Sequence, residues 1–272
     1  MLKKYKGNII FFFTAAVIAL IVAAFYDLQI DIELNNPESI FAIWFRNTGE
    51  IPSRLICPIA GTVLFYTYKN KIQQIAGFII TLGGSAYFGY YFGKYFFIDE
   101  NQMLFSIIYG IGFGIACLTV GSFIKIPDKH KELLRATAIT GIIVMFAQIT
   151  VIEGIKYLWG RIRFRDLIAA GSYGEFTPWY KINGINGNKS FPSGHTAGAG
   201  MSYLMMLIPF ISKKWEGKTQ LCFWIPCIYT STVAFTRLIM GAHYLSDVAV
   251  GGTISFIIVL IAIKIFETRV IN

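Results

Sequence analysis

The sequence contains few charged residues for its length. Only 14% of its 272 residues are Asp, Glu, Lys or Arg, whereas 55% are hydrophobic. In an ordinary soluble domain roughly a quarter of the residues are charged, and these side chains keep the surface hydrated. A chain so poor in charge cannot cover itself with water-compatible groups. The composition therefore excludes an ordinary soluble protein and favours a fold in the lipid bilayer.

The sequence also contains few cysteines and histidines, and it has no pattern of metal ligands. The four cysteines lie inside apolar segments and form no CxxC pair, which is typical of inert buried thiols. No group of Asp, Glu, His or Cys has the spacing of metal ligands, so we expect no metal and no cofactor. Of the three histidines, His130 lies in a cationic stretch and is expected to be solvated. His195 and His243 remain as candidates for chemistry.

The net charge of +9 is compatible with nucleic acid, anionic lipid or a phosphorylated substrate as partner. The Lys and Arg residues lie at the ends of apolar runs, however, and this position fits membrane topology better than a nucleic-acid-binding face. We therefore expect a membrane, and no nucleic acid, as partner.

The apolar runs predict an all-α fold, a polytopic bundle of about eight transmembrane helices. Each span needs about 20 mostly apolar residues. The first run resembles a signal peptide, but it is long and has no clear cleavage pattern, so we expect a retained helix. The second is the weakest, because it contains Arg54 and two prolines. The eight candidates are 8–26, 52–68, 74–95, 104–125, 134–158, 195–212, 219–239 and 244–266.

Loop charges support eight spans with a cytoplasmic N-terminus, because the clusters of Lys and Arg then fall on the cytoplasmic side. The loop 159–194 breaks this rule, since it is predicted outside and carries Arg161, Arg163 and Arg165. Binding of an anionic substrate would explain it, and so would a different topology. The acidic residues expected in outer loops are Asp27, Asp31, Glu33 and Glu38 after the first span and Asp99 and Glu100 after the third.

Three polar clusters lie at the outer ends of predicted spans. In the first, Lys156 and Arg163 are seven residues apart. If the helix continues through both, this spacing places the two cations on one face, where they can hold two phosphate oxygens. A juxtamembrane basic cluster that binds lipid headgroups is the alternative.

The second cluster is Pro192-Ser193-Gly194-His195, at the start of the sixth predicted span. Serine is a good helix cap, and a helix N-terminus presents free N–H groups to an anion. His195 would then lie beside a bound phosphate. A capped helix start with an incidental histidine is the alternative.

The third cluster runs from Thr236 to Asp247 and joins the last two spans. His243 and Asp247 are four residues apart and can face each other. A carboxylate on one ring nitrogen fixes the tautomer and leaves the other nitrogen free to attack. Arg237 supplies a fork of donors for phosphate. A structural polar turn is the alternative, although ionisable residues at membrane depth are usually functional.

All three clusters fall on the same predicted face of the membrane. Together, Lys156-x6-Arg163, Pro192-Ser193-Gly194-His195 and Arg237-x5-His243-x3-Asp247 resemble the three-part signature of the type-2 phosphatidic acid phosphatase superfamily. The resemblance covers about residues 134–266, and two spans exceed the usual six. Phe164 stands where the family usually has Pro, and Thr236 where it has Ser. The first change leaves open whether Arg163, Arg161 or Arg165 contacts phosphate.

The resemblance implies a metal-free membrane lipid phosphatase. It suggests one integral membrane domain, 1–272, with accessory spans in 1–133 and a catalytic core in 134–272. His243 would attack phosphorus and form a phospho-histidine, Asp247 would orient it, and His195 would protonate the leaving group and then activate water. The implied phosphate-binding residues are Lys156, Arg163, Ser193, Gly194 and Arg237.

The implied substrate is a polyprenyl pyrophosphate or a glycerophospholipid phosphate, and the implied site faces the outside or periplasm of the cell membrane. We expect the segment 171–189, rich in Gly, Asn and aromatic residues, to help select the lipid. Two alternatives remain. One is a phosphotransferase of the same superfamily, and the other is a non-catalytic protein that binds or transports a lipid phosphate.

Overall fold

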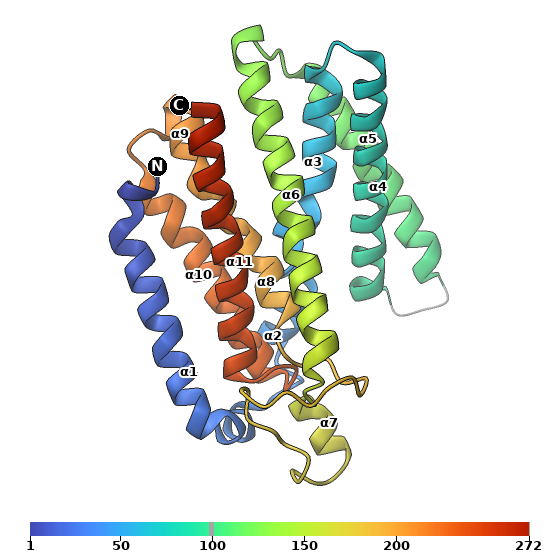
Figure 1. Cartoon of the computed structure of the whole chain (residues 1–272). Coiled ribbons are helices and arrows are strands. Elements are labelled where there is room, and N and C mark those ends of the chain that lie inside the picture. Colours follow the sequence, from blue (N-terminus) through green and yellow to red (C-terminus); the bar gives the residue numbers. More distant parts are fainter. Residues whose placement is uncertain (98–100, 272) are drawn as a thin grey trace. The chain divides into compact units, whose positions relative to one another are not determined.

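The fold is all-α, as predicted. A computed structural model describes residues 1–97 and 101–271 (Figure 1), and no strand occurs in these ranges. Asp99 and Glu100, expected in an outer loop, lie outside the described residues. Six helical stretches within the described chain are long and apolar enough to cross a membrane, which identifies an integral membrane protein.

The chain divides into two compact units. The first unit contains residues 1–50 and 146–264, and the second contains 51–145 and 265–272. The first two helices therefore belong with the segments that carry the three polar clusters. The division predicted from the sequence, at 133/134, stays a prediction.

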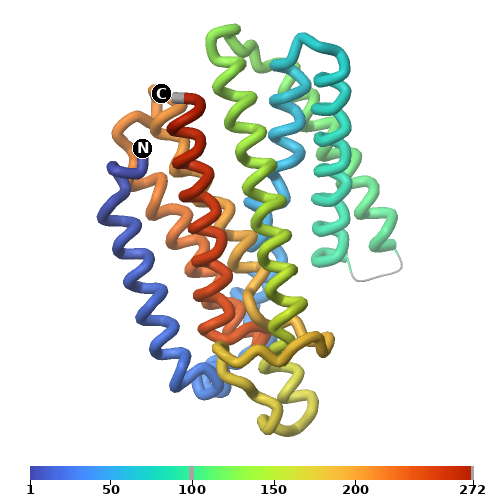
Figure 2. Tube along the Cα trace, in the orientation of Figure 1, coloured from blue at the N-terminus to red at the C-terminus, as the bar shows by residue number. Residues whose placement is uncertain are grey.

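The first unit is built from long helices joined by shorter ones (Figure 2). Its long helices are α1 (Lys6–Leu34), the last part of α6 (Asp128–Trp159), α10 (Thr219–Ile239) and α11 (Leu245–Phe266). Its short helices are α2 (Ile40–Thr48), α7 (Phe164–Ala169), α8 (Gly194–Gly200), the 3₁₀ helix Met201–Leu207 and α9 (Ile208–Ile211).

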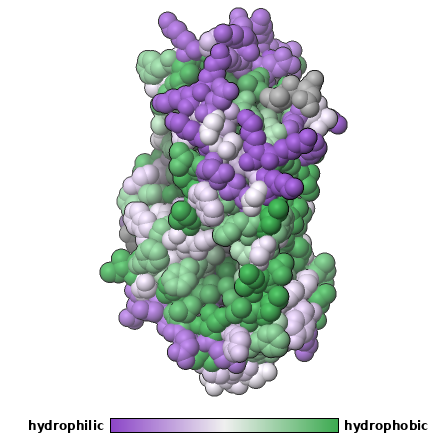
Figure 3. Space-filling model, turned by 90° about the vertical axis from the view of Figure 1, so that its left-hand side faces the viewer, coloured by the Kyte–Doolittle hydropathy of each residue, from purple (hydrophilic) through white to green (hydrophobic). Residues whose placement is uncertain are grey.

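The surface of the first unit is strongly apolar. On α1, Ile21 is 58% exposed and Phe25 is 73% exposed. Hydrophobic side chains gather over much of the face shown in Figure 3 (green), as expected of helices in contact with lipid. The opposite side of α1 contributes to the aromatic core, where the ring centroids of Phe12 and Phe256 lie 4.1 Å apart.

Helix α1 is longer than the predicted span 8–26. It continues to Leu34, so Asp27 and Asp31, expected in a loop, are helical and buried, with 2% and 0% of their surface exposed. That expectation was wrong because the apolar run ends before the helix does. His130 is exposed, as predicted, but it lies in the first turn of α6.

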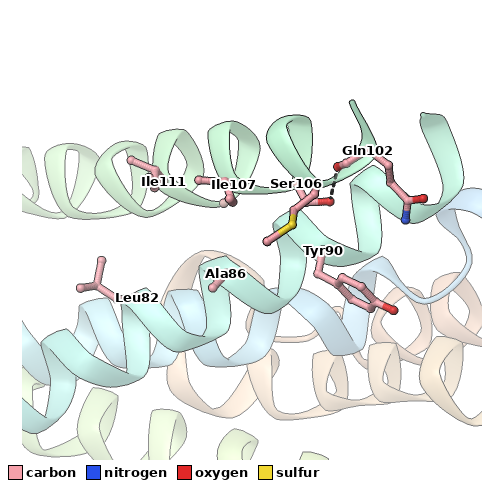
Figure 4. Close-up of a pocket in the computed structure, with 9 residues that line it drawn as sticks. Leu82, Ala86, Tyr90, Gln102, Ser106, Ile107 and Ile111 are labelled. Atoms are coloured by element: carbon pink, nitrogen blue, oxygen red, sulfur yellow. Dashed lines mark hydrogen bonds between the residues drawn. The ribbon is translucent and has the colours of Figure 1, made fainter. Parts of the chain in front are cut away.

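The second unit packs α3 (Ile51–Thr67), α4 (Lys71–Phe96) and α5 (Gln102–Phe123) through glycines. A Cβ atom at Gly61 would lie 2.5 Å from the backbone nitrogen of Thr81, and one at Gly89 would lie 2.3 Å from the carbonyl oxygen of Ser106. Only glycine permits these helices to approach so closely. Helices α4 and α5 also border an apolar cavity of about 800 Å³ (Figure 4), which contains none of the predicted site residues.

Two of the eight predicted spans are not among the six long apolar helices. The second corresponds to α3, which has 17 residues and contains Pro58. The sixth, 195–212, folds as α8, the 3₁₀ helix and α9 in succession rather than as one regular helix. Because length and composition leave these two segments undecided, the count of eight stays a prediction.

Candidate active site

The motif Ser193-Gly194-His195 lies where α8 begins. The Ser193 hydroxyl is the helix cap and accepts hydrogen bonds from the backbone nitrogen and the hydroxyl of Thr196, at 3.3 and 3.1 Å. The backbone N–H of Ser193 donates to the carbonyl oxygen of Asp247 at 2.9 Å. A Cβ atom at Gly251 would lie 2.4 Å from the Ser193 carbonyl oxygen, so this glycine lets α11 lie directly against the motif.

Lys156 reaches the same motif from α6. A Cβ atom at Gly194 would lie only 2.7 Å from Lys156 Nζ, so the missing side chain makes room for the ammonium group. The ammonium also forms an ion pair with Glu153 Oε1 at 2.8 Å. Lys156 is therefore placed at the start of α8, where the sequence predicted a phosphate.

The spacing of Lys156 and Arg163 places both cations on one face only if the helix continues through them, and it does not. The helix ends at Trp159, because Gly160 takes a left-handed conformation with φ of 57°. Arg163 instead caps the short helix α7, and its Nη2 lies 3.5 Å from the carbonyl oxygen of Lys189. The charges of Lys156 and Arg163 nevertheless both act on His243.

The three arginines after α6 have different surroundings. Arg161 is completely buried, whereas the Arg165 side chain is 51% exposed beside Asp166. The Arg161 guanidinium already donates hydrogen bonds to four protein oxygens, so a phosphate would have to displace them. Arg163 is partly exposed and its charge acts on His243, which favours it as the phosphate contact, and this assignment stays a prediction.

Arg161 holds a buried ion cluster together. Its guanidinium donates to Asp27 Oδ2 at 2.9 Å, to Asp247 Oδ1 at 2.6 Å and to Ser246 Oγ at 2.8 Å. It also lies 4.1 Å from the centroid of the Tyr244 ring. One cation therefore fixes both the candidate catalytic carboxylate and a carboxylate from α1.

Phe164 explains how the chain tolerates the missing proline. Its ring is 1% exposed and packs edge-on against Tyr244, with centroids 6.5 Å apart. A Cβ atom at Gly241 would lie 3.1 Å from the Phe164 ring. The ring thus fills the space under the turn that carries His243 and supports that turn by packing.

His243 lies in the turn just before α11 and is 5% exposed. Its Nδ1 lies 3.6 Å from Asp247 Oδ2, an ion-pair distance that is too long for a hydrogen bond. Asp247 is held in place by Arg161, by the Ser190 hydroxyl and by the backbone N–H of Tyr244. The carboxylate faces Nδ1, as the predicted orienting role of Asp247 requires.

Arg237 is buried in α10, and its Nη2 donates to the carbonyl oxygen of Ala42 at 3.4 Å. Its charge acts on His195. The neighbouring Thr236 hydroxyl bonds to the backbone oxygen of Val233 at 2.8 Å. The hydroxyl that Thr shares with the usual Ser therefore bonds within the helix.

Glu50 is a site residue that the sequence reasoning missed. Its Oε1 lies 3.0 Å from His195 Nδ1, and its side chain is 10% exposed. Glu50 occupies the turn between α2 and α3, far from the three motifs in sequence. A single acidic residue at the start of a predicted span gave no signal of this contact.

Among the described residues, no three His, Cys, Asp or Glu side chains are grouped so that they could hold a metal ion. The predicted absence of a metal stays a prediction. The segment 171–189, expected to help select the lipid, folds back on the end of α6, where the Asn186 amide donates to the carbonyl oxygen of Gly160 at 2.7 Å.

The fold and the polar residues together define a polytopic membrane protein with two largely buried histidine–carboxylate pairs and nearby basic side chains. The family model of the PAP2 superfamily matches residues 133–271, just over half of the chain. The chain belongs to this superfamily, and the resemblance seen in its motifs is confirmed. Membership supports a phosphatase-type activity on a lipid phosphate. Searches of curated proteins and of solved structures give no match.

Proposed function

We propose that this protein hydrolyses a phosphomonoester or pyrophosphate of a membrane lipid through a phospho-histidine intermediate, with its site facing the outside or periplasm. The observation that carries the proposal is the pair of histidine–carboxylate contacts, His243–Asp247 and His195–Glu50, with Lys156 Nζ placed against Gly194. The charges of Lys156 and Arg163 act on His243, and that of Arg237 acts on His195. Two imidazoles supply a nucleophile and a proton donor, and three cations supply the charge that a metal would otherwise provide.

In the first step His243 Nε2 attacks phosphorus while the bond from phosphorus to the lipid oxygen breaks. His195 gives its proton to the leaving oxygen, and Asp247 stabilises the positive charge that develops on His243. In the second step His195 takes a proton from water, the water oxygen attacks phosphorus, and the phosphorus–nitrogen bond breaks. Inorganic phosphate leaves and both histidines return to their starting states.

The phosphate oxygens carry most of the charge in the transition state. Lys156, Arg163 and Arg237 would bind them, together with the N–H of Gly194 and the hydroxyl of Ser193. That hydroxyl accepts two hydrogen bonds and still has its own proton to donate. The basic character of the outer loop 159–194 follows from this role, because the substrate is an anion.

Metal independence is tested by chelation. We expect the purified protein in detergent to release phosphate from one or more members of a panel that contains polyprenyl pyrophosphate, phosphatidic acid and phosphatidylglycerol phosphate. Excess EDTA should leave the rate unchanged, because side chains alone bind the phosphate. Loss of activity in EDTA that returns with a divalent cation would contradict the proposal.

The pH profile is expected to be a bell, because His243 must be neutral to attack and His195 must be protonated to donate. Burial lowers the pKa of His243 to about 4, the Asp247 carboxylate opposes this shift, and Lys156 and Arg163 add to it. The imidazole is therefore neutral, and able to attack, at every pH above about 4. The acid limb of kcat/KM should lie well below the usual histidine pKa of about 6.5. The alkaline limb should report loss of the proton from His195. A rate that is constant from about pH 4 to 9 would contradict this assignment.

Product analysis separates hydrolysis from its two alternatives. A phosphotransferase would yield a phosphorylated acceptor in place of inorganic phosphate. A protein that only binds or transports lipid phosphate would yield neither product. The pairing of His243 with Asp247 favours a reaction, because binding alone needs no nucleophile.

A further inference from the structure

Glu50 and His195 form a second histidine–carboxylate pair in the first unit. Glu50 Oε1 lies 3.0 Å from His195 Nδ1, within hydrogen-bond distance, and both side chains are largely buried. Glu50 lies outside residues 133–271, the part of the chain that the family model matches. Membership in the superfamily therefore assigns this residue no role.

The turn that carries Glu50 is fixed to α10. The Tyr229 hydroxyl donates to the carbonyl oxygen of Thr48 at 3.0 Å, and a Cβ atom at Gly49 would lie 3.0 Å from the Val233 side chain. The ring centroids of Phe45 in α2 and Tyr229 in α10 lie 6.3 Å apart. Helix α10 also carries Arg237, so one rigid element positions both the phosphate-binding arginine and the Glu50 carboxylate.

The contact determines which ring nitrogen of His195 is available. An ionised carboxylate can only accept hydrogen bonds, so Nδ1 carries a proton and donates it in a hydrogen bond to Glu50. Nε2 is then the nitrogen that faces the substrate, and the ring cannot rotate without breaking the contact. The other charged or ionisable groups that act on His195 are Arg237, His243 and Lys156. The Glu50 carboxylate thus opposes the effect of these three basic groups on His195.

We propose that Glu50 is the positioning residue for His195, holding it with Nε2 toward the lipid oxygen and stabilising its protonated form. This inference rests on the proposed phosphatase reaction. In the first step the Nε2 proton moves to the leaving alkoxide as the phosphorus–oxygen bond breaks. His195 becomes neutral, and its Nδ1–H group remains hydrogen-bonded to Glu50. In the second step Nε2 takes a proton from water and the imidazolium forms again, stabilised by the same carboxylate.

The test compares two leaving groups. An alkyl phosphate, such as a short-chain phosphatidic acid, needs a proton on its leaving oxygen, whereas p-nitrophenyl phosphate releases a stable anion that needs little protonation. We expect Glu50→Gln to lower kcat for the alkyl phosphate by on the order of 10²-fold and to change kcat for the aryl phosphate only a few fold, with KM nearly constant for both. Glu50→Asp, which keeps the carboxylate, should recover part of the lost rate.

The matched control is Glu38→Gln, which removes the same charge from an exposed residue in the segment before α2. It should behave as the wild type with both substrates. An equal loss with both esters, or no loss with either, in a folded Glu50→Gln protein would overturn the inference while leaving the phosphatase proposal intact. An inactive wild-type protein would instead overturn the phosphatase proposal itself.

A second measurement does not depend on activity. The chain has only three histidines, so ¹⁵N NMR of the histidine-labelled protein gives three sets of ring signals, which His130→Gln and His243→Gln assign. We expect neutral His195 to carry its proton on Nδ1 in the wild type and to show a mixture of tautomers in Glu50→Ala. A wild-type His195 with its proton on Nε2 would overturn the inference even if Glu50 variants were unstable.

Discussion

His243→Ala is expected to release no measurable phosphate from any lipid phosphate, with kcat at least about 10⁴-fold below that of the wild type. The physical reason is the geometry of the turn before α11. Asp247 faces Nδ1 at 3.6 Å, so Nε2 is the only unhindered nucleophile that the motif offers to phosphorus. Alanine removes that atom, so the covalent intermediate cannot form.

The measurement is phosphate release together with trapping of the intermediate. Wild-type protein quenched after brief incubation with ³²P-labelled substrate should carry a label that is stable in alkali and lost in acid, as expected for phospho-histidine. His195→Ala should keep this label longer when the leaving group is good, because the second step lacks its base. His130→Ala, which changes an exposed histidine at the start of α6, is the matched control and should retain full activity. A labelled His243→Ala protein would place the nucleophile elsewhere.

Arg161→Met is expected to destabilise the folded protein by about 3–5 kcal/mol and to abolish activity. The guanidinium is the counter-charge of two buried carboxylates, Asp27 and Asp247. Methionine fills a similar volume but leaves both carboxylates without their partner in surroundings that water does not reach. Loss of the pair therefore costs more than loss of an exposed arginine, and it also releases the carboxylate that faces His243.

The measurement is thermal unfolding in detergent, with phosphate release determined on the same samples. Arg165→Met is the matched control, since it removes the same group four residues later, where the side chain is 51% exposed. Its stability should change by less than about 1 kcal/mol. If the two variants unfolded at the same temperature, Arg161 would have no role as the centre of an ion cluster.

The membrane fold and the family were predictable from the sequence, because both depend on local patterns. Apolar runs of about 20 residues identify long helices, and the three motifs keep their chemical residues at short, fixed spacings. The irregular structure of the sixth span was harder to predict. Its three pieces differ in helix type without any change in apolar composition: Gly194–Gly200, Met201–Leu207 and Ile208–Ile211.

Contacts between distant segments could not be predicted. Asp27 and Glu50 look like ordinary loop acids in the sequence, and nothing local shows that they face Arg161 and His195. The placement of Lys156 and Arg163 on one helix face was not met for a different reason. It assumed a continuous helix, whereas a single glycine, Gly160, ends α6 with a positive φ.

The Asp27–Arg161 pair also has a consequence for biosynthesis. The two residues are 134 positions apart, so α1 enters the membrane long before its counter-charge has been translated. An unpaired carboxylate near the centre of a membrane helix costs about 2.5–3.5 kcal/mol. Asp27 lies seven residues before the end of α1, and this position lets the carboxylate stay close to the aqueous boundary while the ribosome completes the remaining helices. The contact that pairs Asp27 can therefore form only after the chain has been translated as far as Arg161.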